Sequence, residues 1–182
     1  MSNKALFLDR DGVINIDYGY VHKKEDFHFI DGIFDLVRHA NKTDYLVIVI
    51  TNQAGIGRGF FSEKVFIELT SWMKNNFINH NAWVDEVYYC CSHPQHGIGK
   101  YHREDNRRKP SPGMILEAKK QYNINLLKSV LVGDNFTDID AGSKAGVGTN
   151  IFYNHNIKNV NKKSSENFIT IKNLFEVKDY LQ

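Results

Sequence analysis

The sequence predicts an α/β fold in which one parallel β-sheet is flanked by helices on both faces, giving three layers. Two observations predict it. Short apolar runs that end in turn residues alternate with longer stretches whose apolar residues recur at helical spacing. The runs are also apolar along their whole length, which is typical of strands buried on both faces of a parallel sheet. Alternation of this kind indicates right-handed crossovers between parallel strands.

Length and composition indicate a single domain. The 182 residues, 42% of them hydrophobic, are enough for one core, with an insert at about 91–108. The net charge of +2 does not favour a nucleic-acid partner, and the longest apolar run, residues 46–50, cannot span a bilayer. The N-terminus shows no signal pattern, and the two cysteines form no disulfide framework. We expect a monomeric cytoplasmic protein with no membrane or nucleic-acid partner.

The first predicted strand, Ala5–Leu8, ends at two carboxylates, Asp9 and Asp11. Residues two apart on an extended chain point to the same side, so both carboxylates can face one bound group. Two ionised carboxylates this close repel each other, and a divalent cation would relieve the repulsion; an all-oxygen ligand set suits Mg²⁺. An ordinary acidic turn after a strand would explain the same residues.

The remaining elements follow in alternation. Polar residues that can act as N-caps predict where the helices begin. An insert rich in histidine and basic residues is too long for a routine connection. The expected helices begin at Asp31, Ser62, Ser111, about Asp138 and Asn173, the expected strands cover residues 45–50, 84–91, 129–132, 149–153 and 168–171, and residues 154–166 are expected to form an exposed loop.

Polar residues stand at the ends of several predicted strands. Thr51 and Asn52 follow the second strand and open a glycine-rich stretch whose backbone can donate to an anion. Asp134 follows the fourth strand, and Lys109 precedes a helix. Taken singly, Thr51 could be a strand-end cap, Asp134 a turn residue and Lys109 a solvated cation. Because the carboxyl ends of parallel strands meet at one edge of a sheet, together they predict one site.

These residues, in this order, resemble the haloacid dehalogenase superfamily of phosphohydrolases. The resemblance rests on four motifs: FLDRDG, VIVITN, Lys109 in RRKPSPGM, and VLVGDNFTD. Over residues 4–153 the chain is similar to the subgroup of D-glycero-D-manno-heptose 1,7-bisphosphate phosphatases and histidinol-phosphate phosphatases, and its DYGYV segment favours the heptose enzymes. The resemblance implies a Rossmann-like, haloacid dehalogenase-like fold without a large cap domain.

The resemblance also implies roles for individual residues. Asp9 would attack phosphorus to form an aspartyl-phosphate, and Asp11 would act as general acid and then general base. Mg²⁺ would be held by Asp9, the backbone carbonyl of Asp11, and Asp134. Thr51 and the amides after it would bind the phosphoryl oxygens, Lys109 would neutralise charge, and Asp138 would either orient Lys109 or cap a helix. Substrate contacts are expected from Arg10, Asp17, Tyr18, Gly19, Tyr20, Asn52, Gln53, Ala54, Arg108 and Asn135.

The chain departs from the subgroup at two places. The subgroup usually holds a structural zinc through a Cys-x-His and a Cys-x-Cys; here Cys90 matches the first ligand, while Ser92, Asp105 and Arg107 replace the others. A closed zinc site needs four ligands, so we expect no structural Zn²⁺ and an insert held by packing and hydrogen bonds. Asn135 stands where the heptose enzymes often have a lysine.

The expected activity is Mg²⁺-dependent removal of one phosphate from the phosphosugar D-glycero-D-manno-heptose 1,7-bisphosphate, in nucleotide-heptose synthesis for lipopolysaccharide or capsule. Histidinol-phosphate phosphatase is the alternative. A receiver-like phospho-switch, from another functional class, is disfavoured because a second carboxylate, Asp11, promotes hydrolysis instead of storage. A polynucleotide 3′-phosphatase is disfavoured by the near-neutral charge and by the lack of an aromatic and basic groove pattern.

Overall fold

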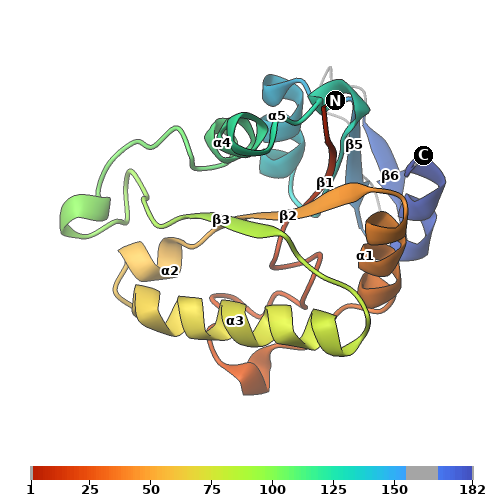
Figure 1. The fold of residues 1–182 in the computed structure, drawn as a ribbon. Coiled ribbons are helices and arrows are strands. Elements are labelled where there is room, and N and C mark those ends of the chain that lie inside the picture. Colours follow the sequence, from red (N-terminus) through yellow and green to blue (C-terminus); the bar gives the residue numbers. More distant parts are fainter. Residues whose placement is uncertain (1, 155–167, 182) are drawn as a thin grey trace.

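A computed structural model of the chain describes residues 2–154 and 168–181, so the predicted loop at 154–166 lies outside the described residues except for Asn154. Six parallel strands form one sheet in the order β3-β2-β1-β4-β5-β6 (Figure 1). The strands are β1 (Lys4–Leu8), β2 (Tyr45–Asn52), β3 (Glu86–Cys90), β4 (Val130–Gly133), β5 (Thr149–Tyr153) and β6 (Ile169–Ile171). The helices are α1 (Ile33–Lys42), α2 (Ala54–Gly57), α3 (Glu63–Asn79), α4 (Gly113–Tyr122) and α5 (Phe136–Ala145), with short 3₁₀ helices η1 (Lys24–Asp26), η2 (Gly99–Tyr101), η3 (Leu126–Lys128) and η4 (Leu174–Tyr180).

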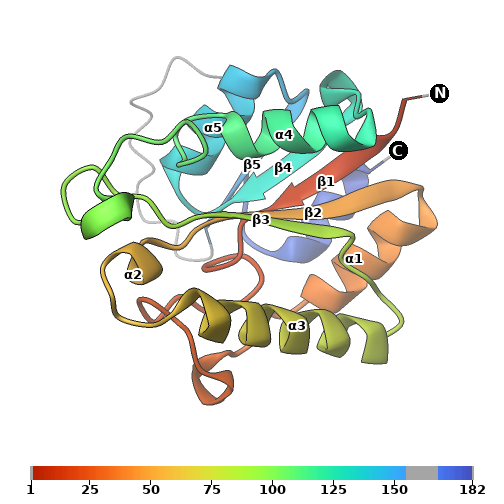
Figure 2. The ribbon, with the colours of Figure 1, turned by 60° about the vertical axis from the view of Figure 1, so that its left-hand side comes forward.

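Helices cover both faces of the sheet, which confirms the predicted three layers. Figure 2 shows α1 and α3 below the sheet and α4 and α5 above it. Along β1, Leu6 and Leu8 belong to the cluster that includes α1, α3 and η4, whereas Ala5 and Phe7 belong to the cluster that includes α4 and α5. In the described parts of the chain, no helix has both the length and the apolar character needed to cross a membrane.

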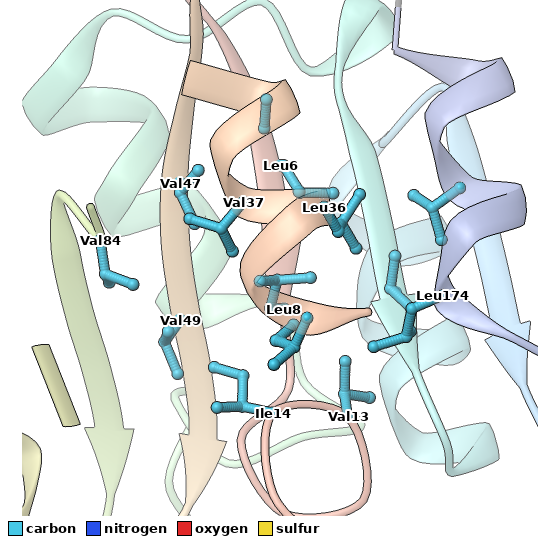
Figure 3. Packing of buried hydrophobic residues seen from close by; sticks show 14 of the residues in the cluster. Leu6, Leu8, Val13, Ile14, Leu36, Val37, Val47, Val49, Val84 and Leu174 are labelled. Carbon is cyan, nitrogen blue, oxygen red and sulfur yellow. The ribbon is translucent and has the colours of Figure 1, made fainter. Parts of the chain in front are cut away.

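The larger cluster holds β1 rigidly at the centre of the molecule. Leu6 and Leu8 pack beside Leu36 of α1 and beside Val47 and Val49 of β2, and all five are fully buried (Figure 3). Burying a side chain of this size contributes about 1.5–3 kcal/mol relative to leaving it exposed. The carboxyl end of β1 is therefore a fixed point on which reactive groups can be placed.

Helix starts follow the prediction at two places and differ from it at three others, one of which is α5, which begins at Phe136 after the N-cap Asn135 and not at Asp138. The Ser62 hydroxyl accepts a hydrogen bond from the Val65 N–H and caps α3, as predicted. α1 is instead preceded by Gly32 in a left-handed conformation (φ 82°), not by Asp31. α4 begins after Pro112, which occupies the N-cap position, and not after Ser111, whose N–H is bonded to the Arg108 carbonyl in the preceding turn. Asn173 does precede the last helix, which is a 3₁₀ helix.

Candidate active site

A pocket of about 390 Å³ lies where the strand order reverses, beyond the carboxyl ends of β1, β2 and β4. Ligands bind at this switch point in open α/β sheets. The pocket brings together most of the residues that the sequence predicted. They are Asp9, Asp11, Asp17, Gly19, Tyr20, Thr51, Asn52, Gln53, Ala54, Lys109, Asp134 and Asn135, joined by Gly55 and Thr137, which were not predicted.

Lys109 is a buried cation at the base of this pocket. Its Nζ lies 2.8 Å from Asp9 Oδ1 and 2.6 Å from Asp138 Oδ1, and only 3% of its side chain is exposed. The same ammonium donates to the carbonyl of Ile50 at 2.9 Å, so its three protons all have acceptors. Burial alone would lower the pKa of Lys109, but the carboxylates of Asp138 and Asp9 outweigh it and raise that pKa.

Three carboxylates surround this single ammonium. Oxygens of Asp9, Asp134 and Asp138 lie within 4.8 Å of one another, and no other group of three possible metal ligands occurs in the part of the chain that the structure describes. Burial, reinforced by repulsion from Asp138, raises the pKa of Asp9 well above its usual value and the pKa of Asp134 to about 7. Excess negative charge of this kind fits a divalent cation, which prefers oxygen ligands.

Asp138 fulfils both of the predicted alternatives, because a carboxylate has two oxygens. Its Oδ1 binds Lys109, and its Oδ2 accepts the backbone N–H of Asn135 at 3.1 Å in the capping box of α5. Both oxygens of Asp138 are thus engaged with the protein. Asp9 and Asp134, the predicted carboxylate ligands of a cation, lie in the same group of three carboxylates, and their role as metal ligands stays a prediction.

Gly12 lets the chain turn beneath Asp134. Its φ of +91° lies in the left-handed region that favours glycine, and a Cβ atom at this position would lie 2.0 Å from Asp134 Oδ2. A side chain here would be strained by the backbone conformation and would have to displace the Asp134 carboxylate. The glycine after the second aspartate is therefore required by the close approach of the first and fourth strand ends.

The carboxylate of Asp11 is held by side chains on several sides. Arg10 donates to it twice, from Nε to Oδ2 at 3.1 Å and from Nη2 to Oδ1 at 2.8 Å. Asn15 donates to Oδ1 at 3.0 Å, and Gln53 donates to Oδ2 at 3.2 Å. Sequence reasoning missed Asn15; the signal that could have found it is a lone amide within the apolar stretch after Gly12, where burial demands a partner.

Arg10 does not fit its predicted role as a substrate contact. Its side chain is 1% exposed, and it is not among the described residues that line the pocket. The guanidinium faces into the protein, where it meets Asp11 and the carbonyl of Val21. These two groups bind Nε and Nη2, whereas Nη1 is buried with no hydrogen-bond partner among the described residues.

The side chains at the end of β2 form hydrogen bonds with other groups of the protein. Asn52 forms a two-way pair with the backbone of Lys109, donating to its carbonyl and accepting its N–H, both at 3.1 Å. Gln53 donates from Nε2 to Thr51 Oγ1 at 2.8 Å, and its backbone N–H is bonded to the carbonyl of Cys90 at 2.7 Å. The predicted phosphoryl contacts of the amides after Thr51 therefore exclude the Gln53 N–H, and the Asn52 amide positions Lys109.

The DYGYV segment, residues 17–21, is called the aromatic loop below, and it forms only part of the pocket rim. Asp17 Oδ1 accepts the N–H of Gly19 at 2.8 Å, and the hydroxyl of Tyr20 accepts a hydrogen bond from Arg58. Tyr18 is 60% exposed and packs edge-on against a histidine ring, away from the described pocket walls. Its predicted contact with substrate does not fit this arrangement.

Arg108 and Asn135 are also engaged with the protein. Arg108 is half-buried and donates to the carbonyl of Ser92 at 3.3 Å, outside the described lining of the pocket. Asn135 lines the pocket, but its Oδ1 accepts the N–H of Thr137 as the N-cap of α5. The direct contact of Arg108 with substrate stays a prediction, whereas Asn135 combines a capping role with a place in the wall.

The insert is held by a second carboxylate centre. Asp105 Oδ2 accepts from Ser92 Oγ at 2.9 Å and from Arg103 Nη2 at 3.2 Å, while Oδ1 accepts the Arg107 N–H at 3.0 Å. Burial acts to raise the pKa of Asp105, but these hydrogen bonds outweigh it and lower that pKa. Two of the positions that replace zinc ligands, Ser92 and Asp105, thus bind each other.

Comparison with known proteins places these observations in a family. A model described as HAD-hydrolase-like matches residues 106–165. D-glycero-alpha-D-manno-heptose-1,7-bisphosphate 7-phosphatase of Burkholderia mallei is 56% identical over 83% of this chain and 80% of its own length. D-glycero-beta-D-manno-heptose-1,7-bisphosphate 7-phosphatase of Vibrio cholerae is 50% identical over 83% of this chain and 81% of its own length.

Solved structures show the same likeness. A HAD-like phosphatase from Mesorhizobium loti has a TM-score of 0.87 and 29% identity, covering 99% of this chain and 86% of its own. D,D-heptose 1,7-bisphosphate phosphatase from B. bronchiseptica, complexed with magnesium and phosphate, has a TM-score of 0.85 and 25% identity, covering 98% and 97%. The chain belongs to the haloacid dehalogenase-like hydrolases, in the group of the heptose 1,7-bisphosphate phosphatases, and is a phosphoric monoester hydrolase.

Proposed function

We propose that the protein is a Mg²⁺-dependent phosphatase that removes the C7 phosphate of D-glycero-D-manno-heptose 1,7-bisphosphate through an aspartyl-phosphate. The observation that carries the chemistry is the Lys109 ammonium between Asp9 and Asp138 at the base of the pocket. The names of relatives at 56% and 50% identity support the substrate. We further propose that it works as a cytoplasmic monomer in nucleotide-heptose synthesis.

Asp9 is the proposed nucleophile. Its Oδ1 accepts both the Lys109 ammonium and the backbone N–H of Arg10 at 2.7 Å. Within the described residues both bonds fall on Oδ1, so we assign Oδ2 as the oxygen that attacks phosphorus. A carboxylate needs no base for this attack. The fixed cation offsets the repulsion between the carboxylate and the incoming phosphoryl oxygens, and electrostatic positioning of this kind dominates phosphoryl transfer.

Asp11 is the proposed general acid and base. In the first step it gives a proton to the sugar oxygen as the bond from that oxygen to phosphorus breaks. In the second step it takes a proton from the water that attacks the aspartyl-phosphate, which returns both aspartates to their starting state. Thr51 lines the same pocket and is the proposed hydrogen-bond partner of the phosphoryl oxygens.

The proposed Mg²⁺ ligands are the carboxylates of Asp9 and Asp134 and the backbone carbonyl of Asp11. Their fit rests on the donor set: three close carboxylates share one ammonium, and the pKa values of Asp9 and Asp134 are raised. When bound, the cation would supply charge neutralisation at a phosphoryl oxygen. Nucleophilic attack and proton transfer are assigned to Asp9 and Asp11.

The phosphosugar would occupy the rest of the pocket. Asp17, Gly19 and Tyr20 line one side of it, and Asn135 lines another. A pocket of about 390 Å³ with mostly polar walls suits a hydroxylated ligand better than an apolar one. We propose these four residues, with the backbone of Ala54, as the contacts to the part of the substrate beyond the transferred phosphate.

A phosphate-release panel tests the proposal. It contains both anomers of heptose 1,7-bisphosphate, histidinol phosphate and a 3′-phosphorylated oligonucleotide, each with Mg²⁺. We expect a heptose bisphosphate to be hydrolysed with the highest kcat/KM, with phosphorus NMR showing loss of the C7 signal. Preference for histidinol phosphate or the oligonucleotide would overturn the substrate assignment. A stable phosphoprotein without phosphate release would instead indicate a phospho-switch.

A further inference from the structure

Arg10 is a fully buried cation directly behind the proposed acid–base residue. Its Nη2 donates to Asp11 Oδ1 at 2.8 Å and to the carbonyl of Val21 at 2.7 Å, and its Nε donates to Asp11 Oδ2 at 3.1 Å. The rings of Phe27 and Phe66 lie 6.0 and 5.6 Å from its Cζ. The side chain is 1% exposed, and Nε and Nη2 make these bonds while Nη1 is buried without a partner among the described residues.

The carboxylate of Asp11 accepts four hydrogen bonds in this arrangement. Oδ1 accepts from Arg10 and Asn15, and Oδ2 accepts from Arg10 and Gln53. A carboxylate has about four lone-pair sites, so all of them are occupied. An acid–base group needs one site open for its proton, and therefore one donor must withdraw during the reaction.

The geometry indicates which donor withdraws. The Gln53 bond is the longest of the four, at 3.2 Å, and Gln53 lines the pocket. Arg10 and Asn15 are 1% and 0% exposed and approach the carboxylate from the protein interior. The oxygen that Gln53 binds, Oδ2, is therefore the one that can exchange a proton with a ligand in the pocket.

We propose that Arg10 is a positioning residue for proton transfer: its two-point contact holds the Asp11 carboxylate from behind and keeps Oδ2 directed at the leaving oxygen when Gln53 moves aside. The inference rests on the proposed function, in which Asp11 is the general acid. The proton leaves Oδ2 for the sugar oxygen as the P–O bond breaks, and a proton returns to Asp11 from the attacking water. Arg10 itself neither gives nor takes a proton in these steps.

The contact with Val21 extends this role to the aromatic loop. One guanidinium nitrogen, Nη2, binds both the Asp11 carboxylate and the Val21 carbonyl, which directly follows the pocket-lining Tyr20. A lysine could restore the charge at this position but not the planar fork, because an ammonium binds as a point charge. Replacing Arg10 by lysine therefore keeps the positive charge but removes the two-point contact, so that the two contributions can be measured separately.

The test compares two leaving groups in Arg10→Lys and Arg10→Met. A sugar alkoxide must be protonated as it leaves, whereas the nitrophenolate of p-nitrophenyl phosphate leaves without a proton. We expect kcat/KM to fall at least about tenfold for heptose 1,7-bisphosphate and less than about threefold for p-nitrophenyl phosphate. The ratio of the two values in one preparation is independent of the fraction of protein that is folded.

Arg38→Lys is the matched control. The Arg38 guanidinium also makes a two-point contact, to the carbonyl of His80 at 3.1 and 3.0 Å, but it lies on α1 away from the pocket. Neither substrate should change its kcat/KM in this variant. Asp11→Asn provides the reference ratio, and adding Arg10→Lys to it should cause no further change in the ratio.

Two outcomes in the Arg10 variants overturn the inference. An equal loss with both substrates would assign Arg10 a structural role only, and no loss with either would show that Asn15 and Gln53 suffice to hold Asp11. Failure of the proposed function looks different: Asp11→Asn would then lower kcat/KM for both substrates equally, whatever Arg10 does.

Discussion

The pocket and the insert both depend on aspartates, but their electrostatics are opposite. In the pocket, Asp9 and Asp134 have raised pKa values, because burial and the nearby Asp138 carboxylate outweigh the Lys109 ammonium, which acts to lower them. In the insert, the pKa of Asp105 is lowered, because hydrogen bonds from the protein satisfy its carboxylate. Excess negative charge in the pocket favours binding of a positively charged ligand. In the insert, the charge of Asp105 is compensated by its hydrogen bonds, which indicates a structural role.

The cations of the two regions differ in the same way. Lys109 is 3% exposed between two carboxylates, whereas Arg103, which pairs with Asp105, is 65% exposed. An exposed ion pair contributes about 0–1 kcal/mol, while removing one partner of a buried pair is far more costly. Substitutions in the pocket should therefore affect catalysis strongly, and those in the insert should have small effects on stability.

The largest expected effect is that of Asp9→Asn. We expect kcat to fall at least about 10³-fold, because the amide cannot attack phosphorus. The fold should remain, since removing one of three crowded carboxylates relieves repulsion and Lys109 keeps Asp138. Phosphate release and thermal melting check the two parts. Turnover near that of the unchanged protein would contradict the nucleophile assignment.

Removal of Mg²⁺ comes next. Treatment with EDTA should reduce phosphate release to background, and added Mg²⁺ should restore it, because the carboxylate cluster then regains its counter-charge. Activity that survives exhaustive chelation would contradict the metal requirement.

The metal effect should also depend on pH. Asp134 has an ordinary pKa of 3.8 and a folded-state pKa of about 7, so the metal-free folded protein binds more protons than the unfolded chain between these values. Its stability therefore falls as pH rises through that window. Mg²⁺ takes the place of those protons, so the increase in Tm on adding it should be larger at pH 8 than at pH 5.5. Calorimetry measures both; an equal increase at the two pH values would show that Asp134 does not link metal binding to proton release.

Gly12→Ala should have an intermediate effect. The left-handed backbone costs about 1–3 kcal/mol for a residue other than glycine, and the new Cβ would also displace Asp134. Gly99→Ala is the matched control, because Gly99 also has positive φ but nothing lies within 4 Å of its Cβ position. We expect both to lose stability but only Gly12→Ala to lose activity, by about tenfold, as measured by melting and phosphate release.

Asp105→Asn should have a smaller effect, confined to stability. The change weakens the contacts with Ser92 and Arg103 and should cost about 1 kcal/mol, with kcat changed less than about twofold. Glu68→Gln, which removes an exposed pair with Lys64 at 3.9 Å, is the control and should leave Tm unchanged. A large loss of activity in Asp105→Asn would show that the insert contributes to catalysis.

The smallest expected effect is that of a zinc-selective chelator on the insert. Cys90 and Cys91 are buried, and burial raises the pKa of both thiols, which disfavours the thiolates that bind zinc. Elemental analysis should find less than one zinc per chain, and Tm should not change on chelation. A stoichiometric zinc content would overturn the proposal that hydrogen bonds replace the metal.

Much of the fold and the place of the site were predictable, because they depend on where polarity changes along the chain. The central strands contain apolar runs, and the residues that follow these runs, such as Asp9, Thr51 and Asp134, meet in one pocket as the parallel sheet requires. Lys109 could be included because its motif precedes a helix. These features follow from one-dimensional order alone.

The direction of individual side chains was not predictable in the same way. Arg10 and Asn52 lie beside pocket residues in the sequence, yet Arg10 faces Asp11 from the interior and the Asn52 amide pairs with the backbone of Lys109. Partners further along the chain help to set both orientations: the Val21 carbonyl for Arg10 and the Lys109 backbone for Asn52. Sequence order indicates which residues are near the site but not which atoms their polar groups bind.

The hydrogen bonds of the Asn52 amide bear on when the active site can form during synthesis of the chain. It bridges two segments whose positions differ by 57 residues, so half of the reactive centre is brought in by the later part of the polypeptide. A nascent chain halted before Lys109 would present its nucleophile with no neighbouring ammonium, and it would be inert. Catalytic competence therefore requires that synthesis has passed Lys109 and that the two segments have paired.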